Sequence, residues 1–359
     1  MEIAVLGGGN GSHAAAVDFT EAGHRVRFWR RDRKAFGAVC ETRRLKLRDS
    51  KSTREVVLAV VTDDLGEAVS GAELIVAPVP AFAQEDLARR LAPHLVDGQV
   101  IYLPPGTFGS YVMAKVLRDN GCVADIAIAE TGTLPWLTRM RGIDEVAITT
   151  RATRLPTGVF PARHGRRALA IINEAFPGAI APVEDALSGA LMNAGPIIHP
   201  PLILMNAGPI EHFDRWDIHK EGTQASIRRV HDALDAERIA VRETLGYGAP
   251  HFPLSDHYNT SDWMYGNLAH DKLVDSGDWH EHLDLMSHRY MTEDVAMGLA
   301  FLVSVGEWAG TPIPVAAGLL AIAGAATGND FRRTGRTLEG LGLCGTTREA
   351  MRALLQEGL

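Results

Sequence analysis

The sequence contains only three cysteines, Cys40, Cys122 and Cys344, in 359 residues. They lie far apart and follow none of the spacings by which cysteines bind zinc or build a disulfide framework. The start of the chain also lacks the basic segment of a secretory signal peptide, because Glu2 follows the first Met. We therefore expect a cytoplasmic protein with no metal site.

Two further features are missing, a block of basic residues and a hydrophobic run long enough to cross a membrane. The formal net charge is -8, whereas nucleic-acid-binding proteins gather lysines and arginines to neutralise phosphates. The longest late apolar stretch, residues 313–326, is interrupted by Pro314, Gly318 and Gly324. It is too short for a membrane span. We expect a buried helix there, and neither a nucleic acid nor a membrane as a partner.

The opening of the chain is rich in glycine. A short apolar run at 3–6 leads into Gly7-Gly8-Gly9-Asn10-Gly11-Ser12, a helical stretch at 11–22 and a second apolar run at 26–29. This order of strand, glycine turn, helix and strand is typical of the first unit of a dinucleotide-binding fold. Gly7 permits the tight turn, and Gly9 lets the backbone approach a pyrophosphate at the helix N-terminus. The candidate cofactor-binding residues here are Gly7, Gly9, Asn10, Gly11 and Ser12.

Alternating strand-like and helical segments continue through the first half of the chain. We expect strands at 56–61, 74–80, 99–103, 126–129 and 146–151, and helices at 32–40, 84–95, 110–120 and 166–176. Such alternation predicts a parallel sheet, in which ligands lie at the carboxyl ends of strands. Pro80 and Glu130 stand at two of these ends and join the cofactor-binding candidates.

The residues after the second strand bear on the choice of cofactor. An acidic residue at this strand end accepts the ribose hydroxyls of NAD, but here the strand runs into Trp29-Arg30-Arg31-Asp32. Guanidinium groups bind a phosphate in a bidentate manner. Arg30 and Arg31 therefore favour NADP. In the alternative both arginines are solvated, Asp32 serves the ribose and the cofactor is NAD.

The pattern changes near Glu184, where helical patterns with polar loops replace strand-like runs. Helices are expected at 226–245, 293–309 and 314–326. We predict an α/β protein with a Rossmann-type dinucleotide-binding domain at residues 1–182, followed by an all-helical C-terminal domain at 183–359. Hydrophobic residues make up 46% of the chain, enough for two cores.

Three segments of the second half resemble one enzyme family. They are an Asn-containing segment, 193–201, that ends in His-Pro-Pro, the segment 289–295 with the sequence Arg-Tyr-Met-Thr-Glu-Asp-Val, and the tail 330–343. With Gly9-Asn10-Gly11 and Glu130-Thr131, these segments resemble the opine dehydrogenases, the octopine and nopaline dehydrogenase family. The similarity covers nearly the whole chain.

The resemblance implies an activity. Opine dehydrogenases condense an amino acid with a 2-oxo acid, using a reduced nicotinamide cofactor, to an N-(carboxyalkyl)amino acid, and they catalyse the reverse oxidation. By this resemblance His199 is the general acid/base and Asp294 its carboxylate partner, Arg289 binds a substrate carboxylate, and Asn193 contacts the substrate or its neighbours. The partners are then two small molecules, whose identity the sequence leaves open. A homodimer remains an expectation.

The chemistry requires these residue types independently of any resemblance. Histidine exchanges protons near neutral pH, a carboxylate fixes its tautomer, and arginine holds a carboxylate with two hydrogen bonds. Structural roles remain as alternatives. His199 is one of 14 histidines and stands at a proline-marked helix break, Asp294 is a favourable charge near a helix start, and Arg289 is able to form a surface ion pair.

Other patterns have plainer interpretations. The segment Met192–Ile197 recurs as Met205–Ile210, each followed by a histidine, His199 or His212; we interpret the repeat as a chance duplication. The His280-Glu281-His282 segment is typical of a solvated loop rather than a metal site. The aromatic residues nearby either pack a loop-rich region or form a wall of the amino-acid pocket: Tyr258, Trp263, Tyr265 and Trp279.

Two other functions compete with this interpretation. A two-domain reductase of the ketopantoate reductase or glycerol-3-phosphate dehydrogenase type would need a catalytic lysine in the helical domain. Lys220 and Lys272 are the only lysines after residue 115, and neither lies in a segment that resembles those families. A nucleotide-binding sensor without catalysis is disfavoured because His199 and Asp294 are both present.

Overall fold

The computed structural model describes residues 1–266, 269–277 and 279–359. The chain forms two compact units, one of Met1–Ala190 with Arg352–Leu359 and one of Leu191–Met351. The first unit thus extends past residue 182, the boundary expected from the sequence. The reason is helix α7 (Ala186–Ala190), which packs on a strand of this unit through glycines. A Cβ on Gly158 would collide with the Asp185 carbonyl.

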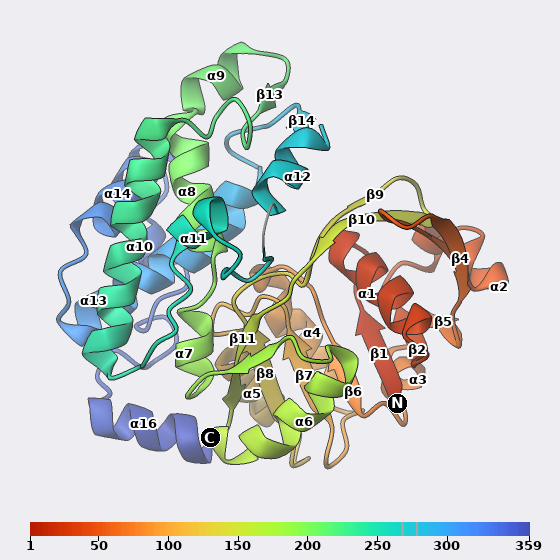
Figure 1. Ribbon diagram of the computed structural model, residues 1–359. Coiled ribbons are helices and arrows are strands. Elements are labelled where there is room, and N and C mark those ends of the chain that lie inside the picture. Colours follow the sequence, from red (N-terminus) through yellow and green to blue (C-terminus); the bar gives the residue numbers. More distant parts are fainter. Residues whose placement is uncertain (267–268, 278) are drawn as a thin grey trace. The chain divides into compact units, whose positions relative to one another are not determined.

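An eight-stranded sheet forms the centre of the first unit (Figure 1). Its order is β12-β11-β8-β7-β6-β1-β2-β5, and the strands from β8 to β5 are parallel. The bounds are β1 Glu2–Leu6, β2 Arg25–Trp29, β5 Val60–Thr62, β6 Leu74–Val76, β7 Val100–Leu103, β8 Ala127–Thr131, β11 Leu155–Phe160 and β12 Ile180–Pro182. This strand order confirms the predicted Rossmann-type sheet and places its switch point between β1 and β6.

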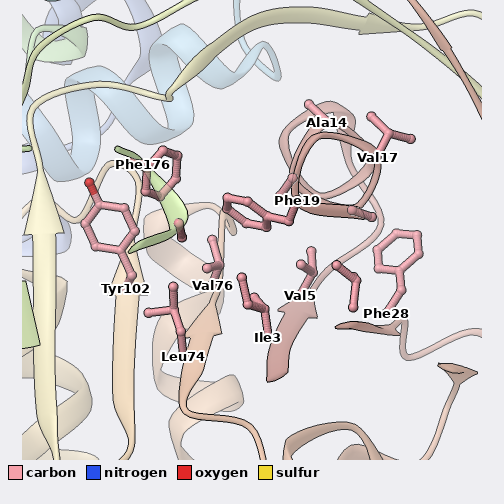
Figure 2. Packing of buried hydrophobic residues seen from close by; sticks show 14 of the residues in the cluster. Ile3, Val5, Ala14, Val17, Phe19, Phe28, Leu74, Val76, Tyr102 and Phe176 are labelled. Carbon is pink, nitrogen blue, oxygen red and sulfur yellow. The ribbon is translucent and has the colours of Figure 1, made fainter. Parts of the chain in front are cut away.

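Helices flank the strands of this sheet. Their bounds are α1 Asn10–Glu21, α2 Val39–Thr42, α3 Leu65–Val69, α4 Gln84–Leu91, α5 Gly109–Asp119 and α6 Gly165–Ala175, with short 3-10 turns at Arg33–Phe36, Ala81–Ala83 and Ala162–His164. Ile3 and Val5 point from β1 toward Phe19 of α1 (Figure 2), while Ala4 and Leu6 belong to a second apolar cluster. Both faces of β1 are therefore buried, as expected for a parallel strand.

A second, four-stranded sheet explains one wrong prediction. It has the order β4-β3-β10-β9, with bounds β3 Arg44–Arg48, β4 Thr53–Val57, β9 Trp136–Met140 and β10 Glu145–Arg151. The sequence predicts one strand over 56–61, but the chain leaves this sheet at Val57 and enters the large sheet at Val60. An uninterrupted apolar run gives no local signal for such a change of sheet.

The second unit is mainly helical. Its helices are α8 Gly195–Met205, α9 Ala207–His212, α10 Ala225–Leu245, α11 Leu254–Asn259, α12 Ala269–Asp275, α13 Ala300–Ala309, α14 Pro314–Thr327 and α15 Phe331–Thr334. The last helix, α16 (Arg348–Glu357), begins in this unit and ends among the residues of the first. The helix expected at 293–309 consists of the π-helix η4 (Tyr290–Leu299) followed by α13. A short pair, β13 (Trp216–Asp217) and β14 (His280–Glu281), qualifies the all-helical expectation. Across the described residues, no helix meets the length and hydropathy that a membrane span requires.

Candidate functional site

The glycine turn lies at the carboxyl end of β1, beside the switch point of the sheet. Gly7 has a φ of +121°, a conformation that residues with a Cβ rarely adopt. A side chain on Gly11 would meet Leu134 at 2.8 Å, and one on Gly9 would face open space. Ser12 is buried and donates from Oγ to the Leu6 carbonyl at 3.3 Å. Glycines and a small serine therefore keep the turn narrow.

The first turn of α1 fits a dinucleotide phosphate. Gly9 occupies the N-cap of α1 and supplies no side-chain cap, so the first amide groups of the helix are available to an anion. Beneath the turn, His13 is buried with its Nδ1 2.9 Å from the Gly9 carbonyl. Burial lowers the pKa of His13. Sequence reasoning did not single out this histidine.

Arg30 lies against the glycine turn. A Cβ on Gly8 would touch the Arg30 side chain, and Arg30 Nη1 donates to the Ala35 carbonyl at 2.8 Å. Asp32, the acid that would serve a ribose, instead accepts from the Lys34 amide at 2.9 Å and caps the 3-10 turn. Arg31 is exposed, and its Nη1 lies 3.7 Å from Asp86 Oδ2.

Two of the other cofactor candidates, Asn10 and Glu130, make hydrogen bonds within the protein. Asn10 Oδ1 accepts from the Met140 amide of β9 at 2.9 Å. Glu130 is fully buried, and its carboxylate accepts from the Phe108 amide at 2.6 Å and from the Ser110 hydroxyl. Through these bonds the Glu130 carboxylate caps the start of α5. Pro80 is exposed, beyond the end of β6. The sequence placed Glu130 at a strand end but did not predict this capping role.

The structure brings His199 and Asp294 together. His199 Nδ1 lies 2.8 Å from Asp294 Oδ2, although the residues are 95 positions apart. Their side chains are 18% and 7% exposed. Because the carboxylate accepts, Nδ1 carries the hydrogen and Nε2 is left to exchange a proton. The predicted pair thus has the geometry of an oriented general acid/base.

Close helix packing produces this contact. His199 belongs to α8 and Asp294 to η4. A Cβ on Gly195 would collide with Asp294 Oδ1, and one on Gly298 would collide with Pro196. Asn193 Oδ1 accepts from the Gly195 amide at 3.0 Å. Asn193 therefore holds the start of α8, and the glycines let the two helices approach.

Two neighbours complete the surroundings of His199. The Tyr290 ring stacks on the imidazole with centroids 3.7 Å apart and planes 8° apart, a contact that sequence reasoning missed. On α10, His231 places Nε2 3.0 Å from the Ile198 carbonyl. Burial lowers the pKa of His231 to about 4. His231 is therefore neutral near pH 7 and adds no charge beside His199.

Arg289 and His212, the remaining candidates, are exposed, unlike the His199–Asp294 pair. Arg289 directly precedes η4; its side chain is 58% exposed and its Nη2 lies 3.4 Å from Glu293 Oε2. His212 ends α9, is exposed, and contacts the Phe213 ring. Of the two repeated histidines, His199 has its ring at hydrogen-bond distance from a carboxylate, whereas the His212 ring contacts a phenyl ring.

The aromatic and histidine-rich segments divide into separate contacts. Trp263 is buried, and its Nε1 donates to the Phe252 carbonyl at 3.1 Å. His257 packs against it with centroids 4.4 Å apart, and burial lowers the pKa of His257 to about 3. Trp279 instead packs on His219. Within the described ranges, no group of three or more His, Cys, Asp or Glu side chains could hold a metal ion.

Comparison with known proteins gives this geometry a context. Residues 182–327 match the family model described as NAD/NADP octopine/nopaline dehydrogenase, alpha-helical domain. Residues 2–104 match a second family model, described as NAD-dependent glycerol-3-phosphate dehydrogenase N-terminus. An opine dehydrogenase of Arthrobacter sp. (strain 1C) is 28% identical over 98% of both chains. Residues 182–327 thus belong to the octopine/nopaline dehydrogenase domain family, and the similarity to an opine dehydrogenase extends over nearly the whole chain.

Further relatives agree with this family. Vitopine synthase of Allorhizobium ampelinum is 28% identical, over 79% of this chain and 78% of its own. Octopine dehydrogenase in complex with NADH and agmatine has the same fold, with a TM-score of 0.72 and 21% identity over 100% of this chain and 98% of its own. The chain is an oxidoreductase of CH–NH bonds that uses a nicotinamide dinucleotide.

Proposed function

We propose that this protein condenses an amino acid with a 2-oxo acid to an N-(carboxyalkyl)amino acid and catalyses the reverse oxidation. The observation that carries the proposal is the 2.8 Å contact between His199 Nδ1 and Asp294 Oδ2 within the octopine/nopaline dehydrogenase domain. Related octopine dehydrogenase structures hold NADH with L-arginine or with pyruvate, which supports these two substrate classes.

The reaction needs a proton donor and acceptor on the protein. The amine attacks the keto carbon, water leaves, and the resulting imine is reduced at the former keto carbon. Overall, amine, keto acid, NAD(P)H and a proton give the secondary amine, NAD(P)⁺ and water. A bound reduced nicotinamide supplies the hydride.

His199 performs the proton transfers in this proposal. Its Nε2 takes a proton from the attacking amine and returns one to the departing hydroxyl. Asp294 keeps the hydrogen on Nδ1 and stabilises the imidazolium formed between these steps. Asn193 holds the start of α8 through the Gly195 amide, and Arg289 binds a substrate carboxylate.

The first prediction concerns the cofactor, which we propose to be NADP. Arg30 packs on the glycine turn, and Asp32 is engaged as a cap. A guanidinium attracts the extra phosphate of NADPH, so kcat/KM is expected to be at least about tenfold higher with NADPH than with NADH. Arg30→Ala should abolish this preference, whereas Arg25→Ala, at the start of the strand β2 that precedes Arg30, should retain it. Equal efficiency with both cofactors, or a preference for NADH, would contradict the assignment.

Arg289 gives the second prediction. An arginine fork holds a carboxylate with two hydrogen bonds that a single ammonium group cannot reproduce. Arg289→Lys should therefore raise the KM of one substrate by about tenfold and leave the KM of NADPH unchanged. Steady-state kinetics with each substrate varied in turn measures this, with Arg229→Lys on α10 as a control. If neither KM changes, Arg289 is only the surface partner of Glu293.

One assay tests the proposed function against its alternatives. NADPH oxidation is followed with a panel of L-amino acids, each paired with pyruvate, glyoxylate or 2-oxoglutarate. The proposal expects turnover only when both an amino acid and a 2-oxo acid are present. Turnover with a 2-oxo acid alone would indicate a reductase of the ketopantoate type, and cofactor binding without turnover would indicate a sensor. Lys220 and Lys272 are both exposed, which does not favour a lysine-dependent reductase.

A further inference from the structure

The His199–Asp294 hydrogen bond does not by itself fix the catalytic ring. With a single bond at Nδ1, the imidazole is still able to tilt by a small rotation through coupled changes of its χ1 and χ2 torsions. The Tyr290 ring lies flat on the imidazole, with centroids 3.7 Å and planes 8° apart. A flat contact at this distance opposes that rotation. Tyr290 is 4% exposed, so the ring itself has little freedom to move.

Tyr290 is held in turn by His219. The Tyr290 hydroxyl lies 2.7 Å from His219 Nε2, and both residues are buried. The Trp279 ring packs on the His219 ring, with ring centroids 5.0 Å apart. His288 contacts the Tyr290 ring by its edge. A buried chain of contacts therefore runs from His219 through Tyr290 to His199.

The loop that carries His219 is fixed by the second copy of the repeated hexapeptide. Asn206 Nδ2 donates to the Gly222 carbonyl at 3.2 Å, and Asn206 Oδ1 accepts from Trp216 Nε1 at 3.2 Å. Between these two points, Asp217 Oδ1 accepts from the His219 amide at 3.1 Å. Asn206 thus bridges both ends of the His219 loop.

The asparagines of the two copies of the repeat hold two different segments near His199. In the first copy, Asn193 holds the start of α8, the helix of His199. In the second copy, Asn206 holds the loop of His219. The sequence suggests a chance duplication, but each asparagine supports one part of the His199 surroundings.

We propose that Tyr290 and His219 are positioning residues for His199, and that Asn206 secures the loop of His219. The inference rests on the proposed role of His199 as general acid/base. It adds to that role a second restraint on the ring, perpendicular to the one that Asp294 supplies. Neither Tyr290 nor His219 needs to touch the substrate for this effect.

Substitutions at Tyr290 separate the ring from the hydroxyl. A misplacement of about 1 Å can lower turnover about a hundredfold, so Tyr290→Leu, which removes the stacked ring, should lower kcat by about tenfold to a hundredfold. Tyr290→Phe keeps the ring and loses only the bond to His219, so a smaller loss is expected. The KM of NADPH should not change in either variant. Tyr247→Leu, at a half-buried tyrosine after α10, is the matched control and should retain the kcat of the unmodified protein.

His219 is tested by rescue. His219→Ala should match Tyr290→Phe in its effect on kcat, and the double variant should be no worse than either one, because both remove the same bond. His219→Gln retains a group that can hydrogen-bond the phenol and should recover most of the lost turnover. Additive losses in the double variant would overturn the role of His219.

The decisive measurement uses the His199→Ala background. All variants are assayed with NADPH and the substrate pair of highest turnover in the panel, and thermal unfolding checks that each is folded. With His199 removed there is no ring to position, so Tyr290→Leu should cause no further loss of kcat. A second loss of the same factor would overturn the inference and indicate a general structural role. Normal kcat for Tyr290→Leu in the unmodified protein would also overturn the inference. Normal turnover of His199→Ala alone would instead overturn the proposed function, and the inference with it.

Discussion

Replacing His199 with alanine is expected to lower turnover by about a hundredfold to ten-thousandfold, the range that a positioned general acid/base contributes. The fold should survive, because the side chain points its Nδ1 at a single partner, Asp294, and retains 18% exposure. Single-turnover kinetics with saturating NADPH measures the loss at the chemical step, and the unfolding temperature should remain close to that of the unmodified protein.

His212→Ala is the matched control for this variant. His212 is the counterpart of His199 in the repeated hexapeptide, but it is exposed at the end of α9. It should therefore retain most of the activity. An inactive His212→Ala together with a normally active His199→Ala would mean that the catalytic histidine was assigned to the wrong copy.

Asp294→Asn is expected to lower turnover by a factor comparable to that of His199→Ala or somewhat smaller. An amide is able to donate to Nδ1, which would place the hydrogen on Nε2 and leave the imidazole in the wrong tautomer. The amide also lacks the charge that stabilises the imidazolium. Because the volume is nearly unchanged beside Gly195, the packing of α8 on η4 should persist.

The double variant shows whether the two residues act as one unit. If both serve a single proton transfer, His199→Ala with Asp294→Asn should be little worse than His199→Ala alone. The matched control is Asp284→Asn, an exposed aspartate before η4, which should turn over normally. Independent losses that multiply, or normal activity of both single variants, would contradict the proposed mechanism.

Local patterns predicted the parallel core of the first unit but missed the strands β3, β9, β11 and β12. The glycine turn, the helix after it and the flanking strands follow from residues close together in sequence, so β1, α1 and β2 are where the sequence places them. The predicted strand at 56–61 is wrong because its two halves pair with different partners, β4 with β3 and β5 with β2. Pairing over such separations leaves no trace in the periodicity of one segment.

The catalytic pair and its supports differ in how far they could be predicted. His199 and Asp294 are 95 residues apart, and only the resemblance to the opine dehydrogenases linked them. The π-helix that carries Asp294 was not predicted, because its residues have the apolar content of an ordinary helix. The stack of Tyr290 and the bond to His219 depend on packing among three separate segments. No spacing in the sequence encodes that packing.

A reductive condensation consumes both substrates, so the product of a single reaction distinguishes it from reduction of the 2-oxo acid alone. The protein is incubated with NADPH, the amino acid and the 2-oxo acid of highest turnover, and the mixture is analysed by mass spectrometry. The proposed condensation should give one new compound with the mass of the two substrates joined, less one oxygen atom, in an amount equal to that of the NADPH oxidised. Formation of the 2-hydroxy acid instead, with the amino acid unconsumed, would contradict it.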